Sequence, residues 1–330
     1  MNNKEYIIFQ LQKNSETFIS GEELAKALNI SRAAISKIIK EIKNEGIVIE
    51  SVPNKGYKLS STNDLISRDI IKNSLQKNGF NLDVYFHRTV NSTNLEAKRL
   101  ILNSSISNPS LIIANEQSQG KGRFGKIFFS PKNSGIYFSI IENSFTNLKN
   151  STFITICTAL AITRAIEKLT GFSTQIKWVN DIFFNEKKIC GILTEAITNF
   201  ETGEIEKLII GIGINFSTID FPKELESAGS LFSPLSLNSN KITRNDLIIN
   251  IVTELDLFFK NFNSLNYREI IEEYKSKSNI LGKEILVTLP NTPPFSAIAV
   301  DIDEFGHLII KKESNEILSL NYGEVSIKKI

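Results

Sequence analysis

One segment of the chain alternates glycines with cations at a spacing that could bind an anion. Residues 115–129 read NEQSQGKGRFGKIFF, in which the alternating residues are Gly120, Lys121, Gly122, Arg123, Gly125 and Lys126. Glycine lets a backbone approach a ligand closely, and backbone N–H groups beside cations suit a phosphate or a carboxylate. The spacing is not that of a Walker loop. The apolar run at 136–141 predicts a strand where a dinucleotide fold needs a helix. A basic surface loop without a ligand is the alternative interpretation.

A lysine at the start of an apolar strand is the second candidate for chemistry. Asn180 and Asp181 lie in a predicted β-hairpin with a turn at 185–186, and Lys188 follows where the next strand begins. Burying a lysine is costly unless an anion meets it, so Lys188 is a candidate ligand-binding group. An ordinary strand pair joined by a turn is the alternative.

Two glycines interrupt another apolar strand, which is predicted at 208–215 and ends in Asn215. Glycines at Gly211 and Gly213, inside a strand, indicate that something packs closely against the backbone. This strand is therefore a further place where a ligand could lie.

Three small polar residues, Ser92, Thr93 and Asn94, precede a predicted helix at 95–102. Thr93 and Glu96 have the spacing of a capping box, so capping alone would explain them. A helix N-terminus with hydroxyl groups also hydrogen-bonds a polar ligand, and the two interpretations are compatible.

The elements that must position these residues form three regions. In the central region, apolar runs predict strands at 84–87, 111–114, 136–141, 187–195 and 208–215, and helices at 65–77, 95–102 and 151–169. Helices at 250–262 and 267–277 follow, and then short strands at 284–289, 295–301, 307–311, 317–320 and 323–330. Five short strands in so few residues predict a small SH3-like barrel.

The first sixty residues predict a winged helix-turn-helix. Helices at 4–13, 22–28 and 32–45, with a hairpin whose turn is at 53–56, give its pattern, and residues 60–64 read as a linker. Such a unit lays its third helix in the major groove. The candidate DNA-binding residues are Ser31, Arg32, Ser36, Lys37 and Lys40 on the outer helix face and Lys55 in the wing. A small domain for protein contacts is the alternative, because nine Lys and Arg against seven Glu is no strong basic patch.

Composition indicates a globular protein of two or three domains. The 330 residues suffice for two or three domains, 41% apolar content is ordinary for a globular protein, and a net charge of +2 does not by itself predict a nucleic-acid binder. Cys157 and Cys190 sit in apolar runs and read as buried thiols of a reducing compartment. Two histidines and two separated cysteines argue against zinc. Without a long apolar segment or a signal peptide, we predict a cytoplasmic protein with no membrane partner.

Taken in order, these motifs resemble the bifunctional biotin protein ligases and biotin-operon repressors of the BirA type over essentially the whole chain. The matching segments are SRAAI (31–35), VPNKGY (52–57), STN (92–94), GKGRFGK (120–126), KWVND (177–181), KICGIL (188–193), GIGIN (211–215), VDIDEFG (300–306) and GEVS (323–326). Each is weak alone, but their order and spacing are specific. The resemblance implies an α+β multidomain chain. Its domains would be a winged helix-turn-helix at 1–62, a mixed α/β ligase domain like the class II aminoacyl-tRNA synthetases at 63–278, and an SH3-like β-barrel at 279–330.

The resemblance also implies an activity. Such enzymes condense biotin with ATP, in the presence of Mg²⁺, to biotinyl-5′-AMP and pyrophosphate. They then pass biotin to one lysine of the biotin carboxyl carrier protein of acetyl-CoA carboxylase. They repress biotin-synthesis genes at operator DNA as ligand-dependent homodimers. The protein would act by positioning, by charge stabilisation and by excluding water.

By the same resemblance, each site residue has an implied role. Lys188 and Arg123 would be catalytic, and Arg123 would also retain the adenylate. The biotin-binding residues would be Ser92, Thr93, Asn94, Gln117, Lys121, Gly122, Arg123 and Lys188. ATP and the adenylate would be bound by Gly120, Lys121, Arg123, Phe129, Lys177, Asn180, Asp181 and Asn215. The loop at 115–129 would become ordered around biotinyl-AMP.

Two departures from the family pattern are visible. Lys121 and Lys126 stand where arginines are usual, which keeps the charge but loses the planar fork. Val179 stands where proline is usual, which should change backbone stiffness more than chemistry. Three other functions remain open at this point: a lipoate–protein ligase, a transcription factor that senses biotin without consuming ATP, and a ligase whose N-terminal domain has lost DNA binding.

Overall fold

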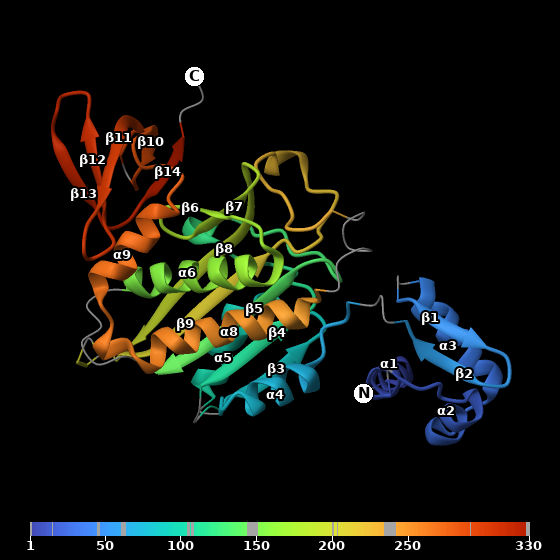
Figure 1. Ribbon diagram of the computed structural model, residues 1–330. Helices are drawn as coiled ribbons and strands as arrows, with labels where there is room; N and C mark the ends of the chain where they lie inside the picture. Colours follow the sequence, from blue (N-terminus) through green and yellow to red (C-terminus); the bar gives the residue numbers. More distant parts are fainter. Residues whose placement is uncertain are drawn as a thin grey trace. The chain divides into compact units, whose positions relative to one another are not determined.

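The computed structural model describes residues 2–14, 16–44, 47–60, 64–103, 106, 109–143, 151–199, 201–202, 204–233, 242–290 and 292–327. The chain divides into two compact units, Met1–Ser67 and Arg68–Ile330 (Figure 1). The described residues contain no helix long and apolar enough to cross a membrane.

The first unit has the predicted winged helix-turn-helix arrangement. Its elements are α1 (Asn3–Lys13), α2 (Gly21–Leu28), α3 (Arg32–Asn44), β1 (Ile49–Val52) and β2 (Gly56–Leu59). Ser20 Oγ accepts from the Glu23 N–H at 3.0 Å and Ser31 Oγ from the Ala34 N–H at 3.1 Å, so hydroxyls cap α2 and α3. The predicted last residue of this helix, at position 45, and most of the linker at 60–64 lie outside the described residues.

The core and wing of this unit follow from its apolar spacing. Ile35, Ile39 and Ile42 of α3 are buried in one cluster with residues of the other helices. The wing strand β2 is tied to Ile19 by two backbone hydrogen bonds of 2.8 Å with Tyr57. Gly56 has φ +111°, and a Cβ there would lie 2.1 Å from the Ile19 carbonyl oxygen, so this position requires glycine.

The second unit is built on a seven-stranded sheet of order β3-β4-β5-β9-β8-β7-β6. The strands are β3 (Asp83–His87), β4 (Ser110–Ala114), β5 (Ile136–Asn143), β6 (Gln175–Lys177), β7 (Asp181–Phe184), β8 (Lys187–Thr198) and β9 (Ile205–Ile214). Only the β3–β4 pair among these strands is parallel. The helices are α4 (Arg68–Lys77), α5 (Thr93–Leu102), α6 (Ser151–Thr170), α8 (Arg244–Lys260) and α9 (Tyr267–Ser276).

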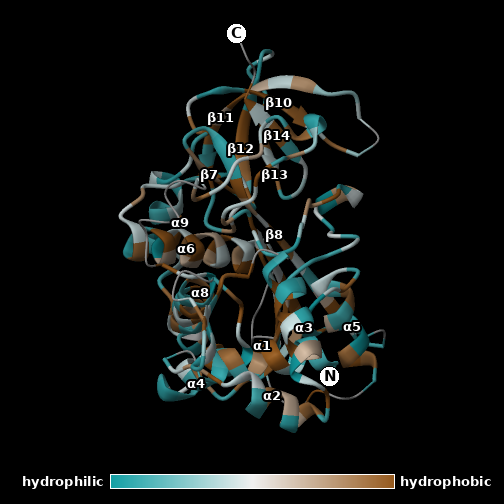
Figure 2. Ribbon diagram, turned by 90° about the vertical axis from the view of Figure 1, so that its right-hand side faces the viewer, coloured by the Kyte–Doolittle hydropathy of each residue, from teal (hydrophilic) through white to brown (hydrophobic). Residues whose placement is uncertain are grey.

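Helices cover both faces of this sheet. On one face, Ala97 and Leu100 of α5 pack in a buried cluster with Ile112, Ile141 and Ile209 of the central strands. On the other face lies α6, whose residues are mostly apolar and buried (Figure 2). Thr155 of α6 hydrogen-bonds Thr194 of β8 at 2.8 Å. Because side chains alternate along a strand, the neighbouring Glu195 points to the α5 face.

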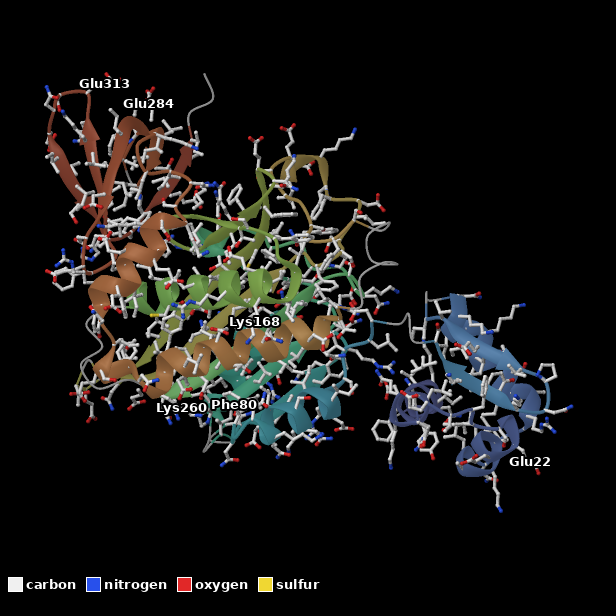
Figure 3. The ribbon with its side chains drawn as sticks, in the orientation of Figure 1. Glu22, Phe80, Lys168, Lys260, Glu284 and Glu313 are labelled. Atoms are coloured by element: carbon white, nitrogen blue, oxygen red, sulfur yellow. The ribbon has the colours of Figure 1, made fainter. Side chains whose placement is uncertain are left out.

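Helix α8 packs beside α6 and α4 and extends further toward the N-terminus than predicted. Lys260 near its end lies over the Phe80 ring, 4.9 Å from the centroid (Figure 3). The sequence predicts a start at residue 250, whereas the helix starts at Arg244, capped by a reciprocal Thr243–Asp246 box. The prediction failed because Arg244 and Asn245, polar but buried, resemble a loop in the sequence. The predicted helix at 65–77 begins at Arg68.

The C-terminal residues form an antiparallel sheet of order β13-β12-β11-β10-β14. Its strands are β10 (Glu284–Thr288), β11 (Phe295–Ile302), β12 (Leu308–Lys312), β13 (Ile317–Leu320) and β14 (Glu324–Ile327). All five predicted strands are present, but β13 and β14 remain edges among the described residues. The closed SH3-like barrel is therefore not confirmed. This sheet contacts the larger one where Trp178 Nε1 donates to the Gly306 carbonyl at 2.9 Å.

Candidate active site

A strip of glycines lies on the α5 face of the large sheet. Gly191 of β8 stands opposite Gly213 of β9, and Gly211 lies one pleat further along. A Cβ on Gly211 would lie 2.2 Å from Asn94 Oδ1, and one on Gly213 would lie 2.6 Å from the Phe128 ring. The predicted close approach to this backbone is confirmed, and the groups that make it are Asn94 and Phe128.

The N-terminus of α5 forms the neutral end of the site. Ser92, Thr93 and Asn94 are all buried. Gln117 Oε1 accepts from the Thr93 N–H at 2.9 Å and lies 3.3 Å from its hydroxyl oxygen. Gln117 Nε2 donates to Ser130 Oγ at 3.0 Å, which leaves the amide one further hydrogen. The structure thus brings together the hydroxyl and amide residues that the sequence predicts for a neutral polar ligand.

The predicted capping box of Thr93 and Glu96 is wrong. The N-cap of α5 is Ser92, which makes no side-chain cap bond, and Thr93 already lies inside the helix. Its hydroxyl is buried beside Ser139, 2.7 Å away. The Glu96 carboxylate instead accepts from Arg99 Nε at 2.9 Å, and this hydrogen bond lowers the Glu96 pKa.

The charged end of the site comes from β7, β8 and the turn before β7. Lys188 Nζ lies 2.6 Å from Asp181 Oδ1, which also accepts from Asn180 Nδ2 at 3.1 Å. Arg123 Nη1 donates to Asn180 Oδ1 at 3.2 Å. Tyr274 of α9 supports the turn by donating to the Val179 carbonyl at 3.1 Å. Four predicted residues thereby meet in one hydrogen-bonded chain.

Two cations of this end are held in a partly desolvated environment. Burial lowers the pKa of Arg123, and the charge of Asp181 opposes this shift. Burial also lowers the pKa of Lys177, again opposed chiefly by Asp181. Four cations, Arg123, Lys126, Lys177 and Lys188, share two nearby carboxylates, Asp181 and Glu324, so an incoming anion would be stabilised here.

The glycine-rich loop is folded back on itself. The Gly122 N–H donates to the Lys126 carbonyl at 2.7 Å, and the Phe128 N–H donates to the Gly120 carbonyl at 2.9 Å. Lys126 Nζ pairs with Glu324 of β14 at 2.6 Å. The Lys121 side chain is exposed, whereas Arg123 is half-buried, so only the second of these predicted ligands lies in the chain of contacts around Asp181.

Phe129 and Asn215, both predicted to bind the adenylate, have different surroundings. The Phe129 ring packs against Phe221, with centroids 6.0 Å apart, whereas its neighbour Phe128 covers the glycine strip. The sequence did not predict Phe128, because it does not show which of two adjacent phenylalanines contacts the glycine strip. Asn215 is 4% exposed, and its Oδ1 has no hydrogen-bond partner among the described residues. An unpaired buried acceptor of this kind is available to a donor on a ligand.

Sequence reasoning also missed Ser139 and Glu195. Ser139 Oγ lies 2.6 Å from Asn94 Oδ1, and Glu195 Oε2 accepts from Asn94 Nδ2 at 2.8 Å. The sequence signal that could have found them was Ser139 as a lone hydroxyl inside the apolar run of β5, and Glu195 as a carboxylate inside the strand β8.

In the first unit, the predicted DNA-binding side chains are all exposed. Ser31, Arg32, Ser36, Lys37 and Lys40 lie at the start and along the outer side of α3. Lys55 is exposed in the turn of the wing. Ser31 has a structural role as well, because its hydroxyl caps the helix.

Comparison with known proteins agrees with this arrangement. The chain matches the models of an HTH domain (residues 3–58), of the biotin/lipoate A/B protein ligase family (85–215) and of the biotin protein ligase C-terminal domain (280–328). It is 32% identical over 302 residues to the bifunctional ligase/repressor BirA of Bacillus subtilis, covering 91% of this chain and 90% of that protein. It is 26% identical over 321 residues to BirA of Escherichia coli, covering 97% and 96%.

A solved structure resembles three quarters of the chain. The biotin protein ligase from Aquifex aeolicus in complex with biotin and ATP superposes with a TM-score of 0.61 at 26% identity, covering 75% of this chain and 99% of that one. The sequence similarity extends over nearly the whole chain, including the helix-turn-helix unit. The chain therefore belongs to the BirA family of bifunctional biotin protein ligases and repressors.

Proposed function

We propose that this chain joins biotin to a carrier protein in two steps at the α5 face of the large sheet. A biotin carboxylate oxygen attacks the α-phosphorus of ATP and displaces pyrophosphate. A carrier lysine amine then attacks the acyl carbon of biotinyl-5′-AMP, AMP leaves, and the amine gives up a proton. The carrier would be the biotin carboxyl carrier protein of acetyl-CoA carboxylase, since a relative from Mycobacterium tuberculosis is named biotin–[acetyl-CoA-carboxylase] ligase.

The observation that carries this proposal is the polarity of the site from one end to the other. Biotin has a neutral ureido ring at one end and a carboxylate at the other. The buried hydroxyls of Thr93 and Ser92 and the partly buried amide of Gln117 suit the ring, and Arg123 and Lys188 suit the carboxylate and the phosphate. The glycine strip on β8 and β9 lies beside Asn94 and Phe128, where a ligand that displaces the Phe128 ring could contact the backbone.

The charged residues have distinct roles in this proposal. Lys188 would exchange Asp181 for the ligand oxygen and stabilise negative charge in both steps. Arg123 would hold the adenylate until the carrier arrives. Asn215 would offer its unpaired oxygen to the nucleotide, while Lys121, Gly120 and Gly122 would supply charge and backbone N–H groups. Lys177, Asn180 and Phe129 would border the adenylate, with Phe128 as an addition.

Magnesium fits this site only together with the nucleotide. The described residues contain no group of three or more His, Cys, Asp or Glu side chains that could hold a metal ion. Magnesium bound through ATP phosphates needs at most one or two protein carboxylates, and Asp181 is the carboxylate at hand. When bound, the ion would offset the charge of the phosphates.

A mass-spectrometric assay tests the ligase proposal. The chain is incubated with biotin, Mg-ATP and a biotin carrier domain, and the carrier mass should rise by one biotinyl group. Lys188→Ala should slow adenylation by about 100-fold or more, as for loss of a donor that stabilises developing charge. Arg123→Gly should release adenylate, which then labels bystander lysines. Lys187→Ala is the matched control, because Lys187 Nζ donates to the Glu226 carbonyl at 2.6 Å, outside the chain of contacts around Asp181. An unchanged Lys188→Ala enzyme would contradict the proposal.

For the first unit we propose operator binding by α3 and the wing, as a ligand-dependent homodimer. The support is the exposed set of Arg32, Lys37, Lys40 and Lys55 on an intact winged helix. Gel shifts with DNA upstream of biotin-synthesis genes, with and without biotin and ATP, test it alongside sedimentation. Activity in the ligase assay without any gel shift would favour a ligase that lacks DNA binding. Biotin-dependent gel shifts without carrier labelling would favour a sensor instead.

A further inference from the structure

A chain of polar groups runs beneath the neutral end of the site, buried at Thr93, Asn94 and Ser139 and part-buried at Glu195. Asn94 Nδ2 donates to Glu195 Oε2 at 2.8 Å and to the Leu193 carbonyl at 3.2 Å. Both amide hydrogens of Asn94 are therefore in use, and its Oδ1 can only accept. The other carboxylate oxygen of Glu195 is paired with Lys98 Nζ at 2.7 Å.

This arrangement fixes the direction of the next hydrogen bond. Ser139 Oγ lies 2.6 Å from Asn94 Oδ1 and 2.7 Å from Thr93 Oγ1, and it has one hydrogen. Two oxygens 2.6 Å apart need a hydrogen between them, and Asn94 Oδ1 cannot supply it. The Ser139 hydroxyl must therefore donate to Asn94.

The consequence reaches Thr93. Its hydroxyl hydrogen can go to Ser139 Oγ at 2.7 Å or to Gln117 Oε1 at 3.3 Å, and both are acceptors in this arrangement. In either case the Thr93 hydroxyl donates its hydrogen to another protein group. Its oxygen keeps a lone pair that can accept a hydrogen bond from a ligand.

We propose that Glu195 is a positioning residue for biotin recognition. It orients the Asn94 amide, which through Ser139 holds the Thr93 hydroxyl as an acceptor for an N–H of the ureido ring. This inference rests on the proposed function, which places biotin against Thr93. Asn94, predicted to bind biotin, acts here by orienting Ser139. The lack of a side chain at Gly211 makes room for it, 2.2 Å from where a Cβ would be.

Removing the acceptor at Glu195 would allow the hydrogen bonds among Asn94, Ser139 and Thr93 to reverse direction. The Asn94 amide would be held only by its 3.2 Å bond to the Leu193 carbonyl, and it could turn its Nδ2 toward Ser139, which would donate to Thr93 in turn. Thr93 would then accept from Ser139 with the lone pair that otherwise serves the ligand, and its own hydrogen would go to the 3.3 Å contact with Gln117 Oε1 or toward the ring N–H. Biotin binding should weaken, while ATP binding, which depends on the charged end, should not.

The test compares two substitutions of one residue. Glu195→Gln keeps a side-chain oxygen for Asn94, whereas Glu195→Leu has a similar size and no acceptor. Calorimetry on the full chain should show biotin bound about 10-fold more weakly by Glu195→Leu and within about threefold of wild type by Glu195→Gln, as expected for one reoriented hydrogen bond. ATP affinity should be unchanged in both, and KM for biotin should rise while kcat stays nearly constant.

A double variant separates this relay from a general loss of structure. Ser139→Ala removes the next group in the chain and should weaken biotin binding similarly. Combining it with Glu195→Leu should add little, because both act through Thr93. Additive losses, or equal losses for Glu195→Gln and Glu195→Leu, would overturn the inference. Normal biotin binding by Glu195→Leu would also overturn it. Absence of biotin binding by the wild-type chain would instead remove the proposed function.

Discussion

Gly211 and Gly213 offer a matched pair of perturbations two residues apart on β9. In each case alanine adds one methyl group to extended backbone. At Gly211 the added Cβ would lie 2.2 Å from Asn94 Oδ1, 2.9 Å from its Cγ and 3.0 Å from its Nδ2. At Gly213 it would lie 2.6 to 2.9 Å from the edge of the Phe128 ring. The two neighbours differ in how far they can move.

The Asn94 side chain has little freedom to yield. An ordinary contact between carbon and oxygen is about 3.3 Å, so the amide would have to shift by about 1 Å. That shift breaks the 2.6 Å contact with Ser139 and disturbs the 2.8 Å bond to Glu195. Two buried hydrogen bonds at about 1 kcal/mol each, plus overpacking, give a loss of about 2–4 kcal/mol. For a unit of this size, that lowers Tm by about 5–12 °C.

Phe128 can yield more cheaply because its ring projects from the glycine-rich loop. We therefore expect Gly213→Ala to lower Tm by less than about 3 °C. Calorimetric melting and biotin titration on both variants make the comparison, with Gly211→Ala also binding biotin at least 10-fold more weakly. Equal melting of the two variants, or normal biotin binding by Gly211→Ala, would refute the idea that a rigid Asn94 frame organises this end of the site.

Three further predictions concern other parts of the chain. Arg32→Ala combined with Lys37→Ala should weaken operator binding and lower the salt slope of the gel shift by about one for each lost phosphate contact; an unchanged slope would remove α3 from the interface. Glu324→Gln removes the ion pair with Lys126 and should speed tryptic cleavage of the ligand-free loop, but only about twofold, because the Lys126 side chain is largely exposed. Biotinyl-AMP should slow cleavage of the wild-type protein and of the variant. Identical cleavage rates with and without biotinyl-AMP would count against loop ordering. Cys157 and Cys190 are fully buried, and burial raises the pKa of both thiols. As pH rises past about 8.5, the unfolded chain therefore loses these thiol protons before the folded chain does, and the free energy of unfolding falls. Rapid labelling of either thiol in the folded protein would contradict this.

The sequence by itself determined the elements whose patterns are local. The three helices and wing of the first unit, the strands β4, β5, β8 and β9, and the helix α6 follow from apolar periodicity and turn residues. The ligase and repressor family followed from the order of its short motifs. The glycines at 211 and 213 correctly indicated a close approach to backbone, because only a packed neighbour makes a missing side chain useful in a strand.

Only the tertiary structure decided which side chains meet. Thr93 and Glu96 have the spacing of a cap, yet burial against Ser139 draws the threonine hydroxyl away from the helix end. Glu195 stands 101 residues from Asn94 in the sequence, and no local pattern encodes that hydrogen bond. Strand pairing and register set the partners of such buried polar groups, and these depend on contacts between distant parts of the chain.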